Sequence, residues 1–153
     1  MADRSTRLDR MVPAAPDAIG PLRRELRRFA RSHGAAADVQ ASVALAFSEA
    51  CASVVRPDAD PLRDPGPLIV RARVRGGELV VQVAHARRGA PPVRGEAGYG
   101  FGLAIISSLC ERFEVRNRPG RPGKEIEMAF RLARAPGPTR SSRRRPSRSS
   151  PRR

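Results

Sequence analysis

Hydrophobic and polar positions along the chain recur with two different periods, which separates helical from extended segments. Apolar residues spaced three or four apart predict a helix from Asp17 to His33, where His33-Gly34 ends the pattern. The same spacing predicts a second helix from about Ala37 to Val55. A third helix is predicted from Phe101 to Phe113.

Alternation with a period of two predicts strands in the remaining patterned segments. These are Thr6–Val12, Leu68–Val74, Glu78–Ala84, Glu114–Arg118 and Glu125–Leu132. The pair Gly76-Gly77 predicts a hairpin turn between the second and third of them. Helices that cover one face of a mostly antiparallel sheet are the economical arrangement for this order of elements. We therefore predict an α+β fold, a two-layer sandwich.

Positive charge is concentrated at the end of the chain. The formal net charge is +15, and residues 134–153 contain eight arginines and no acid, which leaves +7 for residues 1–133. From residue 135 onward the segment consists of Ala, Gly, Pro, Thr, Ser and Arg, and it cannot bury apolar surface. We predict one domain at residues 1–133 and a disordered basic tail at residues 134–153. The tail is either a solvated segment with no specific role or a nonspecific contact for nucleic acid phosphates.

Other features exclude whole classes of protein. No apolar run approaches the roughly 20 residues of a membrane helix, and no hydrophobic signal segment follows the polar start. We therefore expect a cytoplasmic protein that does not bind membranes, with Cys51 and Cys110 as reduced core residues. One tyrosine, no tryptophan and five phenylalanines offer no platform for stacking bases.

Two segments of the chain carry polar residues that are candidates for a functional site. Glu49 and Ser53 stand four residues apart in the second helix, so they share one face beside its buried stripe. The third strand runs into His85 and then into a loop that contains Gly89. Taken alone, Glu49 is typical of a carboxylate on a helix surface.

A glycine-rich turn opens the third helix and completes the pattern. It contains Gly100, Gly102 and Leu103, and unpaired backbone N–H groups at a helix N-terminus are suited to phosphate. The turn does not match the Rossmann fingerprint, because no strand leads into it and Leu103 stands at the place of the third glycine. No Gly-Lys-Ser/Thr follows, which excludes a P-loop.

In this order and spacing the three segments resemble the anti-sigma factor type of serine kinase in the histidine kinase/Hsp90-like ATPase superfamily, which has the Bergerat fold. The resemblance covers roughly Arg7 to Leu132. That family carries a Glu-x-x-x-Asn helix, an Asp-x-Gly-x-Gly turn, a flexible ATP lid and a Gly-x-Gly-Leu turn. The segment between Gly89 and Gly100 would be a short lid, and the chain lacks a helical hairpin with a phosphoacceptor histidine. Both features favour the single-domain anti-sigma branch.

The resemblance implies a role for each matching position. Glu49 would be the catalytic base, Ser53 would bind Mg²⁺, and His85 would stand at the adenine-reading position. Gly89 would belong to the Asp-x-Gly-x-Gly turn, and Gly100, Gly102 and Leu103 would form the turn that cradles the phosphates. The implied cofactors are ATP and Mg²⁺.

Three positions depart from the family's pattern. Ser53 replaces the metal-binding asparagine, His85 replaces the adenine-reading aspartate, and Arg87 stands where a glycine is expected. Each missing interaction weakens nucleotide binding by roughly 1–3 kcal/mol where its partner is left unsatisfied. The phosphate cradle is therefore expected to be kept, and the adenine and metal positions to be impaired.

The sequence leaves three functions open. The first is an ATP-binding serine/threonine protein kinase and anti-sigma regulator in a partner-switching transcription control system. Its partners would be a sigma factor and an anti-sigma factor antagonist protein, and a homodimer stays an option. The second is a pseudokinase with the same fold that binds protein partners without nucleotide turnover. The third is a nucleic-acid-associated protein that binds through its basic tail.

Overall fold

A computed structural model describes residues 5–55, 66–86, 100–117 and 123–133. The elements in these segments, in chain order, are β1 (Arg7–Pro13), α1 (Pro16–Ser32), α2 (Ala37–Val54), β2 (Pro67–Arg75), β3 (Glu78–His85), α3 (Gly100–Leu109), β4 (Arg112–Asn117) and β5 (Lys124–Arg131). The predicted boundaries of β1, α1, α2, β2 and β3 agree with these to within one or two residues.

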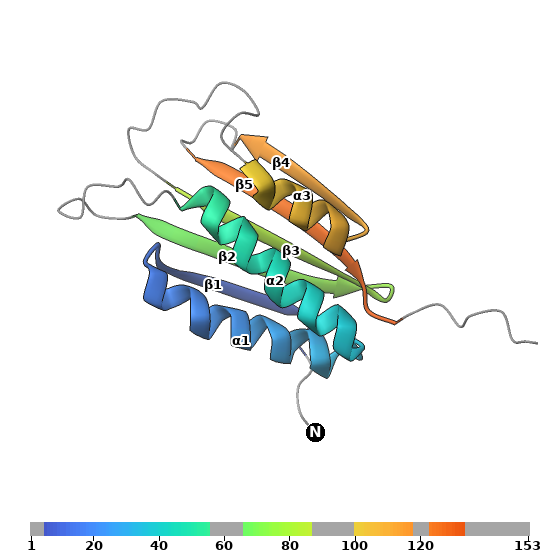
Figure 1. The fold of residues 1–153 in the computed structure, drawn as a ribbon. Helices are drawn as coiled ribbons and strands as arrows, with labels where there is room; N and C mark the ends of the chain where they lie inside the picture. The colour runs from blue at the N-terminus through green and yellow to red at the C-terminus, as the bar shows by residue number, and fades with distance from the viewer. Residues whose placement is uncertain (1–4, 56–65, 87–99, 118–122, 134–153) are drawn as a thin grey trace, which may run out of the picture.

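The strands form one five-stranded sheet in the order β1-β2-β3-β5-β4, and every neighbouring pair is antiparallel. The three helices cover one face of it, with α2 between α1 and α3 (Figure 1). This arrangement confirms the predicted α+β two-layer sandwich. The core lies between the layers, because apolar residues alternate along each strand and point toward the helices.

The strand register shows how the two faces of the sheet differ. One inward row runs from Leu8 through Ala72 and Val81 to Met128, and these four side chains are buried. In the adjacent row the side chains point away from the helices. It contains the pair Asp9–Arg71, joined at 3.5 Å, and the pair Gln82–Glu127, joined at 2.6 Å. This row of the face away from the helices is therefore polar, whereas the buried pair Val80–Ala129 lies in another of its rows.

Glycines with positive φ end α1 and build the β2–β3 hairpin. Gly34 follows α1 with a φ of 88°, and its N–H donates to the carbonyl of Arg31 at 3.1 Å. Gly76 and Gly77 have φ values of 58° and 77°, as a two-residue hairpin turn between twisted strands requires. Both turns lie where the sequence predicts them.

The third helix is shorter than predicted. Its last helical bond joins the Cys110 N–H to the Ile106 carbonyl at 3.2 Å, and α3 ends at Leu109. The Glu111 N–H already donates to the Ala129 carbonyl of β5 at 2.9 Å, and Phe113 pairs with Met128 in the sheet. The prediction of a helix to Phe113 is wrong, because pairing with β5 competes successfully for this backbone.

The structure describes both cysteines, but it does not describe the predicted tail. Cys51 is buried and Cys110 is half-buried, and both are free thiols. Residues 134–153 lie outside the described residues, so the boundary between domain and tail stays a prediction. Within the described segments, none of the helices has both the length and the apolar character needed to cross a membrane.

Candidate functional site

The central helix α2 places Glu49 and Ser53 on one half-buried face. Most of α2 is apolar, and its stripe from Val43 to Val54 packs on the sheet. Glu49 and Ser53 lie at the edge of this stripe, and neither is fully buried. The Ser53 hydroxyl donates to the Glu49 carbonyl oxygen at 2.9 Å, which fixes its rotamer against its own helix.

The start of α3 approaches α2 closely at these two residues. A methyl group added at Gly102 would lie 3.2 Å from Ser53 Oγ and 3.4 Å from Glu49 Oε2. The structure thus brings Gly102 to Glu49 and Ser53, which precede it by 53 and 49 residues in the chain. Since a helix N-terminus carries partial positive charge, it also favours the Glu49 carboxylate without any ligand.

The other two residues of the predicted glycine turn lie in the same helix. Gly100 is the first residue of α3, and Leu103 is half-buried against the core. Gly89 and Arg87 lie outside the described residues. The predicted lid between Gly89 and Gly100 lies outside them as well.

His85 ends β3 and is buried beneath the end of α2. Its side chain is 7% exposed, and its Nδ1 lies 3.0 Å from the Val54 carbonyl oxygen. Because a carbonyl only accepts hydrogen bonds, Nδ1 carries the proton in this contact. Val54 follows Ser53 directly, so the adenine-reading and metal-binding positions of the resemblance meet at one end of α2.

Two glycines outside the predicted set make this arrangement possible. A methyl group at Gly123 would lie 2.0 Å from the His85 carbonyl oxygen, and one at Gly66 would lie 2.7 Å from the Ala86 carbonyl oxygen and 3.6 Å from His85 Nε2. Both have positive φ, 122° for Gly123 and 73° for Gly66. In the sequence Gly66 stands between two prolines and Gly123 follows one, which marks a turn at each but does not indicate His85 as the neighbour.

The donor set fits a nucleotide unevenly. Gly100 and Gly102 open a helix whose N-terminal N–H groups suit phosphate, and the Glu49 carboxylate lies beside this turn. Ser53 supplies one hydroxyl oxygen for a cation, and within the described segments there is no cluster of three metal-binding side chains. His85 supplies a buried imidazole, which bonds to the protein backbone, in place of a carboxylate. The phosphate side therefore fits the expected group, and the adenine position does not.

The sheet order and the helical layer define a two-layer α+β domain, in which α2 meets the start of α3. The model of the histidine kinase-like ATPase domain family matches residues 12–130, and the chain belongs to this family. ATP and Mg²⁺ are the cofactors that such ATPase domains generally use. Among curated proteins no sequence matches the chain.

Solved structures support the fold. The chain is similar to the crystal structure of the RsbU and RsbW domains of Rv1364c from Mycobacterium tuberculosis, with 22% sequence identity and a TM-score of 0.64. The match covers 84% of this chain and 33% of that one, so the chain spans about a third of that protein's length. At this identity the likeness shows a shared fold.

Proposed function

We propose that the protein is an anti-sigma regulatory factor of the partner-switching type, which acts by binding protein partners and has lost efficient nucleotide turnover. The partners would be a sigma factor and an anti-sigma factor antagonist in the cytoplasm. The observation that carries this proposal is the state of His85, which bonds to the Val54 carbonyl inside the protein.

The imidazole at position 85 is poorly suited to recognise adenine. Recognition of an exocyclic amino group requires a fixed acceptor, which an aspartate supplies with either oxygen. The Nδ1–H of His85 is used for the Val54 carbonyl, and burial to 7% exposure limits reorientation of the ring. We infer that purine binding at this position is weak.

Ser53 weakens the metal position in a similar way. Its hydroxyl is one bond shorter in reach than an asparagine carbonyl, and the hydrogen bond that it donates to the Glu49 carbonyl holds it against its own helix. Mg²⁺ requires oxygen ligands at about 2.0–2.1 Å in near-octahedral geometry. Two weakened interactions of roughly 1–3 kcal/mol each would move a micromolar nucleotide site to the millimolar range.

The alternative is an active serine/threonine kinase, which the position of Glu49 supports. Its Oε2 lies next to Gly102, so a carboxylate stands beside the turn that would hold the phosphates. Glu49 would then act as the general base on a substrate hydroxyl. In the proposed regulator the same carboxylate stabilises the N-terminus of α3.

Calorimetric titration of ATP into the full chain, with and without Mg²⁺, separates the two functions. The restoration variant Ser53→Asn/His85→Asp serves as the comparison. We expect weak or undetectable binding by the native chain and tighter, magnesium-dependent binding by the restored variant. Micromolar binding by the native chain would contradict the proposal and favour the kinase.

A phosphotransfer assay tests the kinase directly. The native chain is incubated with Mg²⁺-ATP and a candidate antagonist protein, with Glu49→Gln as the matched control. We expect no transfer in either case. Transfer that requires Glu49 would establish the kinase and its base, whereas transfer that survives Glu49→Gln would remove Glu49 from that role.

A further inference from the structure

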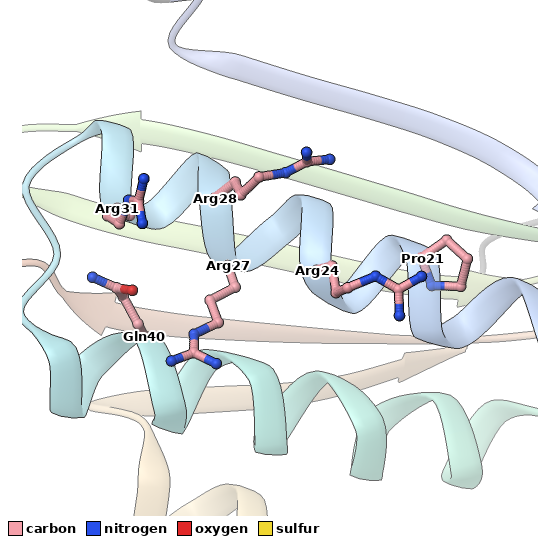
Figure 2. A pocket seen from close by; sticks show the side chains of 6 residues that line it. All are labelled: Pro21, Arg24, Arg27, Arg28, Arg31 and Gln40. Atoms are coloured by element: carbon pink, nitrogen blue, oxygen red, sulfur yellow. The ribbon is translucent and has the colours of Figure 1, made fainter.

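The exposed face of α1 carries a stripe of arginines. Arg24, Arg27, Arg28 and Arg31 recur at the spacing that places residues on one helix face, and all four are exposed. Together with Pro21 and with Gln40 of α2 they line a groove of about 400 Å³ (Figure 2). We call these four residues the arginine stripe.

The arginine stripe has no anionic partner in the part of the chain that the structure describes. None of its four guanidinium groups lies within ion-pair distance of a carboxylate there. Glu25, the nearby acid of α1, pairs with Arg10 of β1. Like charges at i and i+4, as in Arg24 and Arg28, destabilise a helix. The stripe therefore has a cost that an acidic ligand would relieve.

The adjoining helix presents an apolar face beside the groove. Gln40, Ala44 and Ser48 lie on the side of α2 toward α1, and Arg23 reaches Ser48 with an N–O distance of 3.3 Å. One position further round, Ala41, Leu45 and Ala52 are exposed, and Leu45 is 47% exposed. We call these three residues the apolar stripe. Glu49, the first charged residue after Asp38 in α2, stands four residues after Leu45 and three before Ala52, so it borders the apolar stripe.

We propose that the arginine stripe and the apolar stripe together form a docking surface for an acidic amphipathic helix of a protein partner. Carboxylates on one side of that helix would bind the guanidinium groups in forked pairs. Its apolar side would cover Leu45 and the flanking alanines. This inference rests on the proposed function only in taking the partner to be a protein.

Charge and chemistry argue against the other occupants of this surface. A second copy of the chain would bring one arginine stripe toward another, on a protein whose net charge is already +15. A nucleic acid backbone would satisfy the arginines but would leave Leu45 and its alanines against phosphate and water. An acidic helix with an apolar face satisfies both stripes.

Fluorescence anisotropy with a designed probe tests the docking surface. The probe is a labelled peptide of about 18 residues, long enough for five helical turns, with glutamates on one face and leucines on the next. A peptide of identical composition in scrambled order is the control ligand. We expect the patterned peptide to bind the full chain at least about tenfold more tightly than the scrambled one.

Matched substitutions then locate the binding. Arg27→Glu/Arg28→Glu and Leu45→Glu should each weaken binding of the patterned peptide by about tenfold or more. Arg73→Glu/Arg75→Glu makes the same charge change on exposed residues of the opposite sheet face and should weaken it by less than about threefold. If the charge reversal unfolds the protein, binding is measured on Arg27→Gln/Arg28→Gln instead. This variant removes the two charges but keeps good helix formers.

Four outcomes would overturn the proposal. Equal loss in the groove and sheet-face variants would indicate general electrostatic attraction. Equal binding of patterned and scrambled peptides would exclude a helix-specific surface. A duplex DNA probe that competes for the groove, or dimerisation that is lost in Leu45→Glu, would assign the surface to another occupant. No ATP is present in these assays, so their result is independent of the ATP titration.

Discussion

At residue 102 any side chain would press on the neighbouring helix α2. A methyl group there would lie 3.2 Å from Ser53 Oγ, closer than a side-chain carbon normally approaches. Gly102 lies within α3 and has no positive φ, so its requirement is steric and not conformational. The candidate site therefore depends on a close approach between two helices, and the identity of residue 53 is coupled to residue 102.

A double-mutant cycle measures this coupling. Gly102→Ala gains about 0.5–1 kcal/mol of helix propensity, but we expect a net loss of about 1 kcal/mol because overpacking costs about 1–3 kcal/mol. In the Ser53→Ala background the nearest oxygen is absent, and Gly102→Ala should be neutral or stabilising. The measurement is the free energy of unfolding in urea for all four proteins. Additive effects would show that the two helices separate freely at this point.

Replacing His85 by the aspartate that the family's nucleotide site carries should lower the stability of the protein. His85→Asp places a carboxylate against the Val54 carbonyl and should lower the free energy of unfolding by about 2–3 kcal/mol at neutral pH. His85→Asn retains an amide donor and should lose about half as much. Acidification should reduce the difference between the two variants, because a protonated carboxyl group can donate to Val54. A difference that is independent of pH would contradict the hydrogen-bond explanation.

Burial controls the reactivity of Cys51. Desolvation raises the pKa of its thiol from 9.0 to about 12, and burial raises the pKa of the half-buried Cys110 thiol as well. Because the folded-state pKa of Cys51 is raised, its contribution to stability is present below about pH 9 and is lost as the pH rises toward 12. At about pH 8 we expect an alkylating reagent to modify Cys110 first. Mass spectrometry after proteolysis identifies the modified thiol, and faster labelling of Cys51 would contradict its burial.

At the scale of elements, the end of β3 is enclosed by two turns. Gly66 precedes β2 and Gly123 precedes β5, and each backbone passes directly over a carbonyl of His85 or Ala86. These are the strands that pair with β3 on either side. The position of His85 beneath α2 is therefore set by β2 and β5 as much as by its own strand.

Alanine substitutions at two glycines distinguish the cost of a steric overlap from the cost of a positive φ. Gly123→Ala should destabilise the protein by about 2–4 kcal/mol, because it adds a steric overlap with the His85 carbonyl to the cost of a positive φ. Gly76 also has a positive φ, of 58°, but no atom lies within 4 Å of an added methyl group. Gly76→Ala should therefore lower the free energy of unfolding by only about 1–2 kcal/mol. Chemical denaturation compares the two variants. Equal losses would show that the close approach at Gly123 contributes nothing.

Periodicity predicts the kinds of element well and their limits less well. Apolar spacing predicts the helices α1 and α2, because their buried residues fall on one stripe that packs on a sheet. It misplaces the end of α3. Phe113 continues the helical spacing, but it belongs to β4 and pairs with Met128 of the neighbouring strand β5. Pairing with β5 depends on residues 124–131, which the local pattern does not contain.

At the scale of the whole molecule, charge is distributed by region. The described face of α1 carries the arginine stripe, the opposite sheet face pairs several of its arginines with acids, and eight further arginines lie in residues 134–153. Exposed pairs such as Glu78–Arg112 add little stability, although the Arg112 hydrogen bond holds the pKa of Glu78 below its usual value. We propose that the tail, and not the domain, accounts for any nonspecific attraction to nucleic acid.

Truncation after Ala133 tests the role of the tail. It removes eight of the arginines and leaves a net charge of +7. We expect duplex DNA affinity to fall and the dependence of log affinity on log salt to become shallower, by about 0.9 for each phosphate that the shortened chain no longer neutralises. The free energy of unfolding should not change. Unaltered DNA binding by the shortened chain would exclude the tail as the binding segment.

The sequence by itself determined the order of elements, the α+β class and the segments that carry Glu49, Ser53, His85 and Gly102, because periodicity, turn glycines and motif spacing are local properties. Only the tertiary structure decided how these residues meet. It placed Gly102 against Ser53 and Glu49, turned the His85 ring toward Val54, and brought Gly66 and Gly123 over the same strand end. These arrangements arise from packing between segments far apart in the chain, so no local pattern specifies them.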